Sequence, residues 1–222
     1  MKKNRIMGVA FLIQSITPLI ASAVLLNPLI SGNDIIQIMT RVAGNPVQMR
    51  AAVLGEMITA LGIIFLGVVL YQFLRKENEI MALTGLGFYM MEAVLLVISR
   101  STGFTLLGIS LESAVAGHPV YLQSIADMLL NTMDFNYTLA MLAFSTGAPL
   151  FYYLLYRSRM VPSALALWGF VTAIIPCLAA TLLSMMGIYV PFFVYLPYAP
   201  FEFVIGIWIL VKGIRGQAII AK

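Results

Sequence analysis

The sequence predicts an all-α integral membrane protein, a bundle of six transmembrane helices with both termini in the cytoplasm. Hydrophobic residues make up 61% of the 222 residues and charged residues only 10%, against about 45–50% and about 25% in soluble domains. Such a chain cannot cover its surface with polar groups, so it requires lipid as its solvent. The apolar residues also form six long segments, and basic residues cluster beside the segment ends, as membrane topology requires.

The apolar segments predict the elements in order, within a single membrane domain covering residues 1–222. Each segment has at least the roughly 20 residues needed to cross the hydrocarbon core. Residues 108–118 are expected to form an external loop, after which Pro119 begins a helical stretch that reaches Tyr156. The predicted spans are residues 6–26, 47–74, 80–107, 131–156, 162–186 and 191–211.

A short helix is predicted between the first two spans, where residues 27–46 are too polar to cross a membrane. Ile35, Met39 and Val42 recur at helical spacing within residues 34–43, and Gly44 and Pro46 follow as stop signals. We expect this amphipathic helix to lie on the outer surface of the membrane.

The distribution of basic residues sets the predicted orientation, because cytoplasmic loops carry an excess of Lys and Arg. Three arginines fall on the outer side: Arg41, Arg50 and Arg100. The other ten of the 13 basic residues fall on the inner side: Lys2, Lys3, Arg5, Arg75, Lys76, Arg157, Arg159, Lys212, Arg215 and Lys222. One alternative stays open at the first span, since Ala21-Ser22-Ala23 resembles a signal-peptide cleavage site.

Ionisable residues inside the spans are the candidate functional residues, because a charge in the membrane is costly and is retained for a purpose. Counting about 1.5 Å per residue from the inner turns puts Glu202 near mid-membrane and most of the other charges in the outer half. We therefore predict an outward-facing polar crevice in which Arg100 pairs with a carboxylate. The candidate crevice residues are Glu56, Glu92, Arg100, Asn131, Asp134, Tyr198 and Glu202.

Two helices support the crevice. On the fourth, six polar residues fall on one face at about 100° per residue, and such a stripe belongs in a bundle interior or a wet cavity. They are Gln123, Asp127, Asn131, Asp134, Thr138 and Ser145. On the sixth, Tyr195 and Tyr198 share the face of Glu202, and Pro197 and Pro200 are expected to break the helix just before it.

The sequence lacks the motifs of the common catalytic, metal-binding and nucleic-acid-binding sites. The sequence has no Gly-rich phosphate loop and no Ser-x-x-Lys or G-x-S-x-G motif, so we assign no catalytic residue. One cysteine, Cys177, and one histidine, His118, cannot build a typical zinc site, and we expect neither metal nor cofactor. The scattered basic residues form no nucleic-acid-binding run. The expected partner is the lipid bilayer; the oligomeric state is left open.

These residues favour a non-enzymatic protein that binds or transports a small or lipid-like molecule through the crevice. Two alternatives remain at this point: a membrane enzyme that uses carboxylates on lipid, and a structural or protective partner of another membrane protein. Buried Glu–Arg pairs also often fix helix register and nothing more.

Three stretches carry a resemblance to a known family. They are residues 156–162 (YRSRMVP) with Leu167-Trp168-Gly169, Glu202 with residues 208–213 (WILVKG), and residues 92–96 (EAVLL). On these the chain resembles the bacterial membrane-protein family catalogued as domain of unknown function 4386, from Arg5 to Gly213. The resemblance implies a bacterial cytoplasmic membrane and a retained first helix. The family name carries no activity, so no functional residue is transferred.

Overall fold

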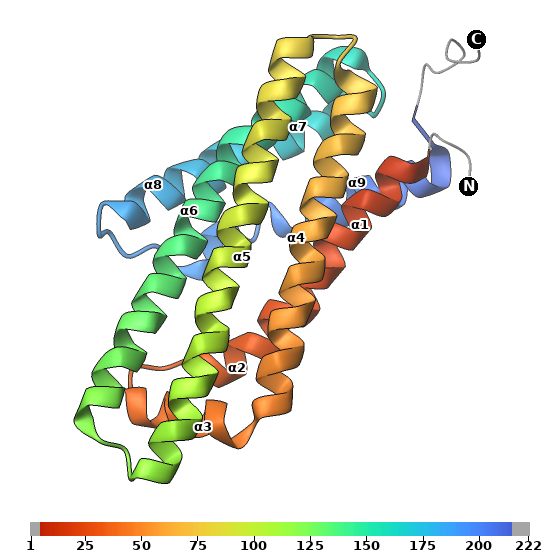
Figure 1. Cartoon of the computed structure of the whole chain (residues 1–222). Helices are drawn as coiled ribbons and strands as arrows, with labels where there is room; N and C mark the ends of the chain where they lie inside the picture. The colour runs from red at the N-terminus through yellow and green to blue at the C-terminus, as the bar shows by residue number, and fades with distance from the viewer. Residues whose placement is uncertain (1–4, 215–222) are drawn as a thin grey trace. The chain divides into compact units, whose positions relative to one another are not determined.

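Six helical segments in the computed structural model are long and apolar enough to cross a membrane, which confirms the predicted number of spans (Figure 1). The structure describes residues 5–214, apart from the side chain of Phe192. Four of the basic residues used to predict orientation, Lys2, Lys3, Arg215 and Lys222, lie outside these described residues. The segments are Ile6–Ile30, Pro46–Leu74, Glu79–Ala116, Val120–Ser158, Ser163–Met185 and Phe193–Lys212.

The three central segments are uninterrupted helices: α4 (Pro46–Leu74), α5 (Glu79–Ala116) and α6 (Val120–Ser158). The others change their winding near prolines. The first consists of α1 (Ile6–Pro18), the π-helix η2 (Leu19–Leu26) and α2 (Asn27–Ile30), and the fifth of α7 (Ser163–Thr172), the π-helix η3 (Ala173–Ala179) and α8 (Ala180–Met185). Pro18 directly precedes η2, and Pro176 lies within η3. Proline lacks an N–H, so the ordinary hydrogen-bond ladder cannot continue through it, and a wider turn accommodates the gap.

The chain forms two compact units, and α4, α5 and α6 each contribute to both. Unit 1 consists of Met1–Ser15, Leu61–Ala93 and Thr138–Lys222. Unit 2 consists of Ile16–Ala60 and Val94–Tyr137. The predicted site residues therefore divide into two groups, which are described separately below.

In unit 1, glycines allow the helices to approach closely. A Cβ atom on Gly67 of α4 would lie 3.1 Å from Tyr89 of α5, and one on Gly85 of α5 would lie 3.0 Å from the ring of Phe151 of α6. Tyr89 and Phe151 are both fully buried, and their rings meet edge to face at 5.2 Å. Small residues of this kind are how membrane helices pack without a hydrophobic driving force.

The external loop predicted at residues 108–118 is wrong, because α5 continues as a helix to Ala116. The prediction ended the helix where the membrane span was complete, but no helix breaker occurs between Gly108 and Ala116. Ser110 and Ser113 are fully buried, so tertiary packing holds the extension in place. The chain turns only at Gly117 and His118, which both adopt positive φ angles.

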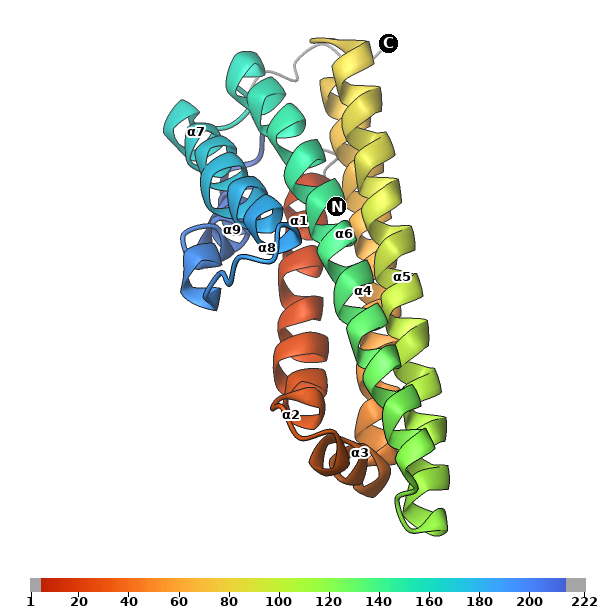
Figure 2. The same cartoon turned by 90° about the vertical axis from the view of Figure 1, so that its left-hand side faces the viewer.

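The short helix predicted between the first two spans is present as α3 (Ile35–Gly44), next to α2 in Figure 2. Asp34 caps it by accepting hydrogen bonds from the backbone N–H groups of Ile36 and Gln37. Protein covers its apolar face, since Ile38, Met39 and Val42 are buried in two apolar clusters of unit 2. The clusters also contain, among others, Leu26, Leu29, Met49, Leu106, Leu107, Leu122 and Ala126.

The sixth segment is broken, as its prolines predict. A 3₁₀ turn, η4 (Phe192–Tyr195), leads into α9 (Ala199–Lys212), the short last helix in Figure 2. Pro200 occupies the first turn of α9, where its missing N–H costs nothing. The indole N–H of Trp168 donates to the carbonyl of Pro197 at 3.0 Å, which satisfies a carbonyl in the break. Tyr195 therefore precedes the helix, and the prediction that it shares a helical face with Glu202 is wrong.

The orientation remains a prediction, and cysteine labelling would decide it. Lys76 is exposed in the turn between α4 and α5, and Val115 is exposed at the far end of α5. In a Cys177→Ala background, a membrane-impermeant maleimide added to intact cells is expected to label Val115→Cys fully and Lys76→Cys only after lysis. The reverse pattern would contradict the orientation. Ser113 is unsuitable for this purpose because its side chain is fully buried.

Candidate functional site

The buried charge pair of unit 2 joins α4 to α5. Glu56 is 1% exposed and Arg100 is 5% exposed. Arg100 Nε lies 3.7 Å from Glu56 Oε2. The predicted pairing of Arg100 with a carboxylate is confirmed, and its partner is Glu56.

A serine connects the two charges. The Ser22 hydroxyl of η2 donates to Glu56 Oε1, and Arg100 Nη2 lies within hydrogen-bond distance of the same hydroxyl oxygen at 3.3 Å. Small residues bring η2 to this position, because a Cβ atom on Gly55 would lie only 2.7 Å from that of Ala21. Ser22 is a site residue that was not predicted from the sequence, although the small residues beside it are typical of a close helix contact.

The guanidinium of Arg100 also contacts residues of α6. Its guanidinium lies 5.0 Å from the ring centre of Tyr137, a cation–π distance, and its charge also interacts with Asp134. Asn131 donates to Asp127 at 3.2 Å, and Asp127, Asn131 and Asp134 are exposed in unit 2. The polar stripe of this helix is thus exposed at these three residues, whereas Ser145 is fully buried. Its place on a bundle interior or in a wet cavity stays a prediction.

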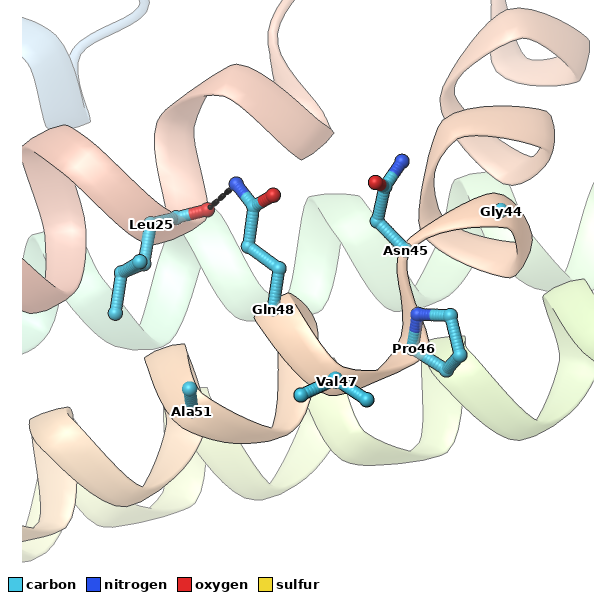
Figure 3. Close-up of a pocket in the computed structure, with 7 residues that line it drawn as sticks. All are labelled: Leu25, Gly44, Asn45, Pro46, Val47, Gln48 and Ala51. Atoms are coloured by element: carbon cyan, nitrogen blue, oxygen red, sulfur yellow. Dashed lines mark hydrogen bonds between the residues drawn. The ribbon is translucent and has the colours of Figure 1, made fainter.

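A pocket of unit 2 opens where α3 meets α4 (Figure 3). Its polar side chains already have partners within the chain. Gln48 donates to the carbonyl of Leu25, and Asn45 donates to the carbonyl of Arg41, both at 2.9 Å. Gly44, Pro46, Val47 and Ala51 complete the lining. This pocket therefore offers few groups for recognising a ligand.

Unit 1 holds a buried chain of hydroxyl groups that ends on a carboxylate. The hydroxyls of Tyr152 on α6 and Tyr198 lie 2.6 Å apart, and Tyr198 donates to Glu202 Oε1 at 2.7 Å. Tyr198 immediately precedes α9 and Glu202 lies in its first turn. Both are 8% exposed and Tyr152 is fully buried. The prediction that Glu202 faces the protein interior is confirmed.

A second carboxylate faces this chain from α5. Glu92 is 3% exposed and lies close enough to Glu202 for their charges to interact. Its Oε2 atom has no hydrogen-bond partner, and the hydroxyl of fully buried Tyr89 lies near that of Tyr152 without a well-formed hydrogen bond to it. The Tyr89 hydroxyl is within electrostatic range of Glu92, Glu202 and Tyr152. Ser15 of α1 reaches the same place, beside Glu202.

An aromatic frame fixes the position of Glu202. Phe201 is fully buried and meets the rings of Tyr152 and Trp168 edge to face, at 4.9 and 5.8 Å. Gly169 of α7 makes room for it, since a Cβ atom there would lie 2.2 Å from the Phe201 ring. With its neighbour held in this way, Glu202 has little freedom to turn away from Tyr198.

We define the acid–tyrosine cluster as Ser15, Tyr89, Glu92, Tyr152, Tyr198 and Glu202. Three of the seven predicted crevice residues, Glu92, Tyr198 and Glu202, belong to it. The other four, Glu56, Arg100, Asn131 and Asp134, belong to unit 2. Sequence reasoning missed Ser15 and Tyr89, whose neighbours along the chain gave no periodic polar signal; Tyr152 extends the polar face of α6.

The family model for the domain of unknown function DUF4386 matches residues 6–213, nearly the whole chain. The chain belongs to the DUF4386 family. This confirms the resemblance carried by Glu92, the turn at residues 156–162 and the last helix. No curated protein and no solved structure matches the chain. The DUF4386 assignment thus covers both units, and the function must be argued from the residues themselves.

Proposed function

We propose that the chain is a membrane protein that binds and moves a small or lipid-like molecule, and that the acid–tyrosine cluster is the point of binding. The observation that carries this proposal is the hydrogen-bonded chain Tyr152–Tyr198–Glu202, buried in unit 1 beside a second carboxylate. A carboxylate at membrane depth is expensive and is kept where it binds or transfers something.

The broken helix supports the same conclusion. Irregular backbone at membrane depth is tolerated where it is buried in protein or lines a cavity, and transporters place their binding sites at such breaks. Glu202 lies in the first turn of α9, directly after the break at Pro197. The Glu56–Arg100 pair, in contrast, is internally neutral, and we assign it a structural role. The proposal places the protein in the cytoplasmic membrane of a bacterium.

Co-purification of a small molecule tests this proposal. The full chain is isolated in lipid nanodiscs, washed and denatured, and the released molecules are identified by mass spectrometry. A molecule retained by the wild-type chain is expected to fall about tenfold or more in Glu202→Gln and in Tyr198→Phe, since a hydrogen bond to a charged group contributes about 1.5–3 kcal/mol.

The matched control is Glu112→Gln, the same substitution at an exposed position of α5, which is expected to retain the molecule. Equal contents in all four proteins, with all of them folded, would contradict a role for the cluster in binding.

A further inference from the structure

The two buried carboxylates of unit 1 differ from Glu56 in what balances their charge. Glu56 has a built-in cation, Arg100, at 3.7 Å. The basic residues that the structure describes in unit 1 are all exposed: Arg5, Arg75, Lys76, Arg157, Arg159 and Lys212. Glu92 and Glu202 are therefore within electrostatic range of each other in the interior of unit 1, without a buried basic side chain among its described residues.

A hydrogen bond stabilises the negative charge of one of the two carboxylates, Glu202. Glu202 accepts a hydrogen bond from Tyr198 at 2.7 Å and lies in the first turn of α9, where the free backbone N–H groups favour a negative charge. Glu92 lies mid-helix in α5 and has neither advantage. Its Oε2 atom is buried without a partner, an arrangement that is unfavourable for a charged group unless something is bound there.

A buried hydroxyl group lies within electrostatic range of Glu92. The Tyr89 hydroxyl is fully buried, lies near that of Tyr152 without a well-formed hydrogen bond to it, and is within electrostatic range of Glu92 and Glu202. A carboxylate oxygen and a hydroxyl oxygen can both coordinate a cation, and a cation would supply the positive charge that this interior lacks. One positive charge is enough, since Glu202 is already stabilised by its hydroxyl donor and its place on α9.

We propose that the carboxylate of Glu92 and the hydroxyl of Tyr89, next to Glu202, bind one monovalent cation. The cation supplies the charge that Arg100 supplies to Glu56. The ion is either an alkali cation or a proton, because both carry one charge and both bind oxygen. The role of the bound ion rests on the proposed function: movement of the ion is coupled to movement of the small molecule.

The other titratable groups around the site come from several elements. They are Tyr152 on α6, Cys177 on η3 and Tyr198 next to α9, each within electrostatic range of Glu202. Their uncharged forms add no positive charge, so the bound cation remains the balancing one.

Thermal unfolding of the full chain in detergent tests the inference, followed by the fluorescence of Trp168 and Trp208. In the salt arm, NaCl or KCl replaces N-methylglucamine chloride at constant ionic strength and pH. In the pH arm, the pH falls from about 8 to about 5 at constant salt. A ligand that binds only the folded state raises Tm as its concentration rises, and a proton does the same as the pH falls.

The wild-type Tm is expected to rise by several degrees in one arm: the salt arm if the ion is an alkali cation, the pH arm alone if it is a proton. Glu92→Gln is expected to lose this rise, and Glu112→Gln to keep it. Tyr89→Phe, which retains the buried ring, is expected to weaken the rise and serves if Glu92→Gln does not fold.

The inference is overturned if wild type, Glu92→Gln and Tyr89→Phe respond alike in both arms. It is also overturned if Glu112→Gln loses the response as fully as Glu92→Gln. Retention of a small molecule is measured separately, so an ion response without a retained molecule would reject the proposed function and leave the ion site standing.

Discussion

Replacing Arg100 by alanine is expected to lower the free energy of unfolding by about 3–5 kcal/mol, the usual cost of removing one partner of a buried ion pair. The substitution leaves Glu56, which is 1% exposed, without its cation. It also removes the contacts of the guanidinium with Ser22 and with the ring of Tyr137. Reversible unfolding in mixed micelles, followed by circular dichroism, measures the loss.

Arg50→Ala is the matched control, because Arg50 is exposed; we expect a loss below about 0.5 kcal/mol. Arg41 is less suitable for this purpose, since it donates to the carbonyl of Ser31. A loss in Arg100→Ala no greater than that in Arg50→Ala would show that the pair contributes nothing to stability.

A double-mutant cycle separates the pair from its surroundings. Glu56→Ala alone leaves Arg100 buried without its carboxylate, whereas the double variant removes both charges. The double variant is therefore expected to lose clearly less stability than the sum of the two single losses. Strict additivity would indicate that Arg100 is balanced by another group, such as Asp134.

The second large effect is expected at Gly8, where α1 crosses α9 in unit 1. A Cβ atom at Gly8 would lie 2.7 Å from the carbonyl oxygen of Gly206 and 2.8 Å from the backbone nitrogen of Leu210. Backbone atoms cannot rotate out of the way as a side chain can, so the two helices would have to separate. We expect Gly8→Ala to cost about 1–3 kcal/mol in the free energy of unfolding.

The crossing of α1 and α9 also brings Ser15 beside Glu202, so Gly8→Ala is further expected to reduce retention of the small molecule. The control is Gly87→Ala: Gly87 is a helical glycine with open space around its Cβ position. Alanine there favours the helix by up to about 1 kcal/mol. If both variants were equally stable, close packing at Gly8 would be refuted.

Much of the fold follows from properties that can be counted along the chain. Six spans could be predicted because hydrophobicity over about 20 residues is a local property that lipid selects directly. The break before Glu202 could also be predicted, because Pro197 and Pro200 lack the N–H groups that a continuous helix needs. The burial of Glu202 followed from its position between apolar neighbours on both sides.

The partners of the buried charges could not be predicted in this way. The sequence did not decide which carboxylate pairs with Arg100, because helical spacing gives the face of a residue but not which helix lies opposite. The tertiary structure selects Glu56, with Ser22 brought in by the close approach of Ala21 and Gly55. The sequence likewise ended α5 where the span was complete, whereas buried Ser110 and Ser113 extend it to Ala116.

By itself, then, the sequence determined that this chain is a six-span helical membrane protein with carboxylates inside its spans. Only the tertiary structure decided that Glu56 is neutralised by Arg100, while Glu92 and Glu202 share an interior with Tyr89, Tyr152 and Tyr198. The physical reason is that composition fixes which residues leave water, whereas contacts between small residues far apart in the chain, such as Gly8 with Gly206, fix how closely the helices approach and which side chains then meet.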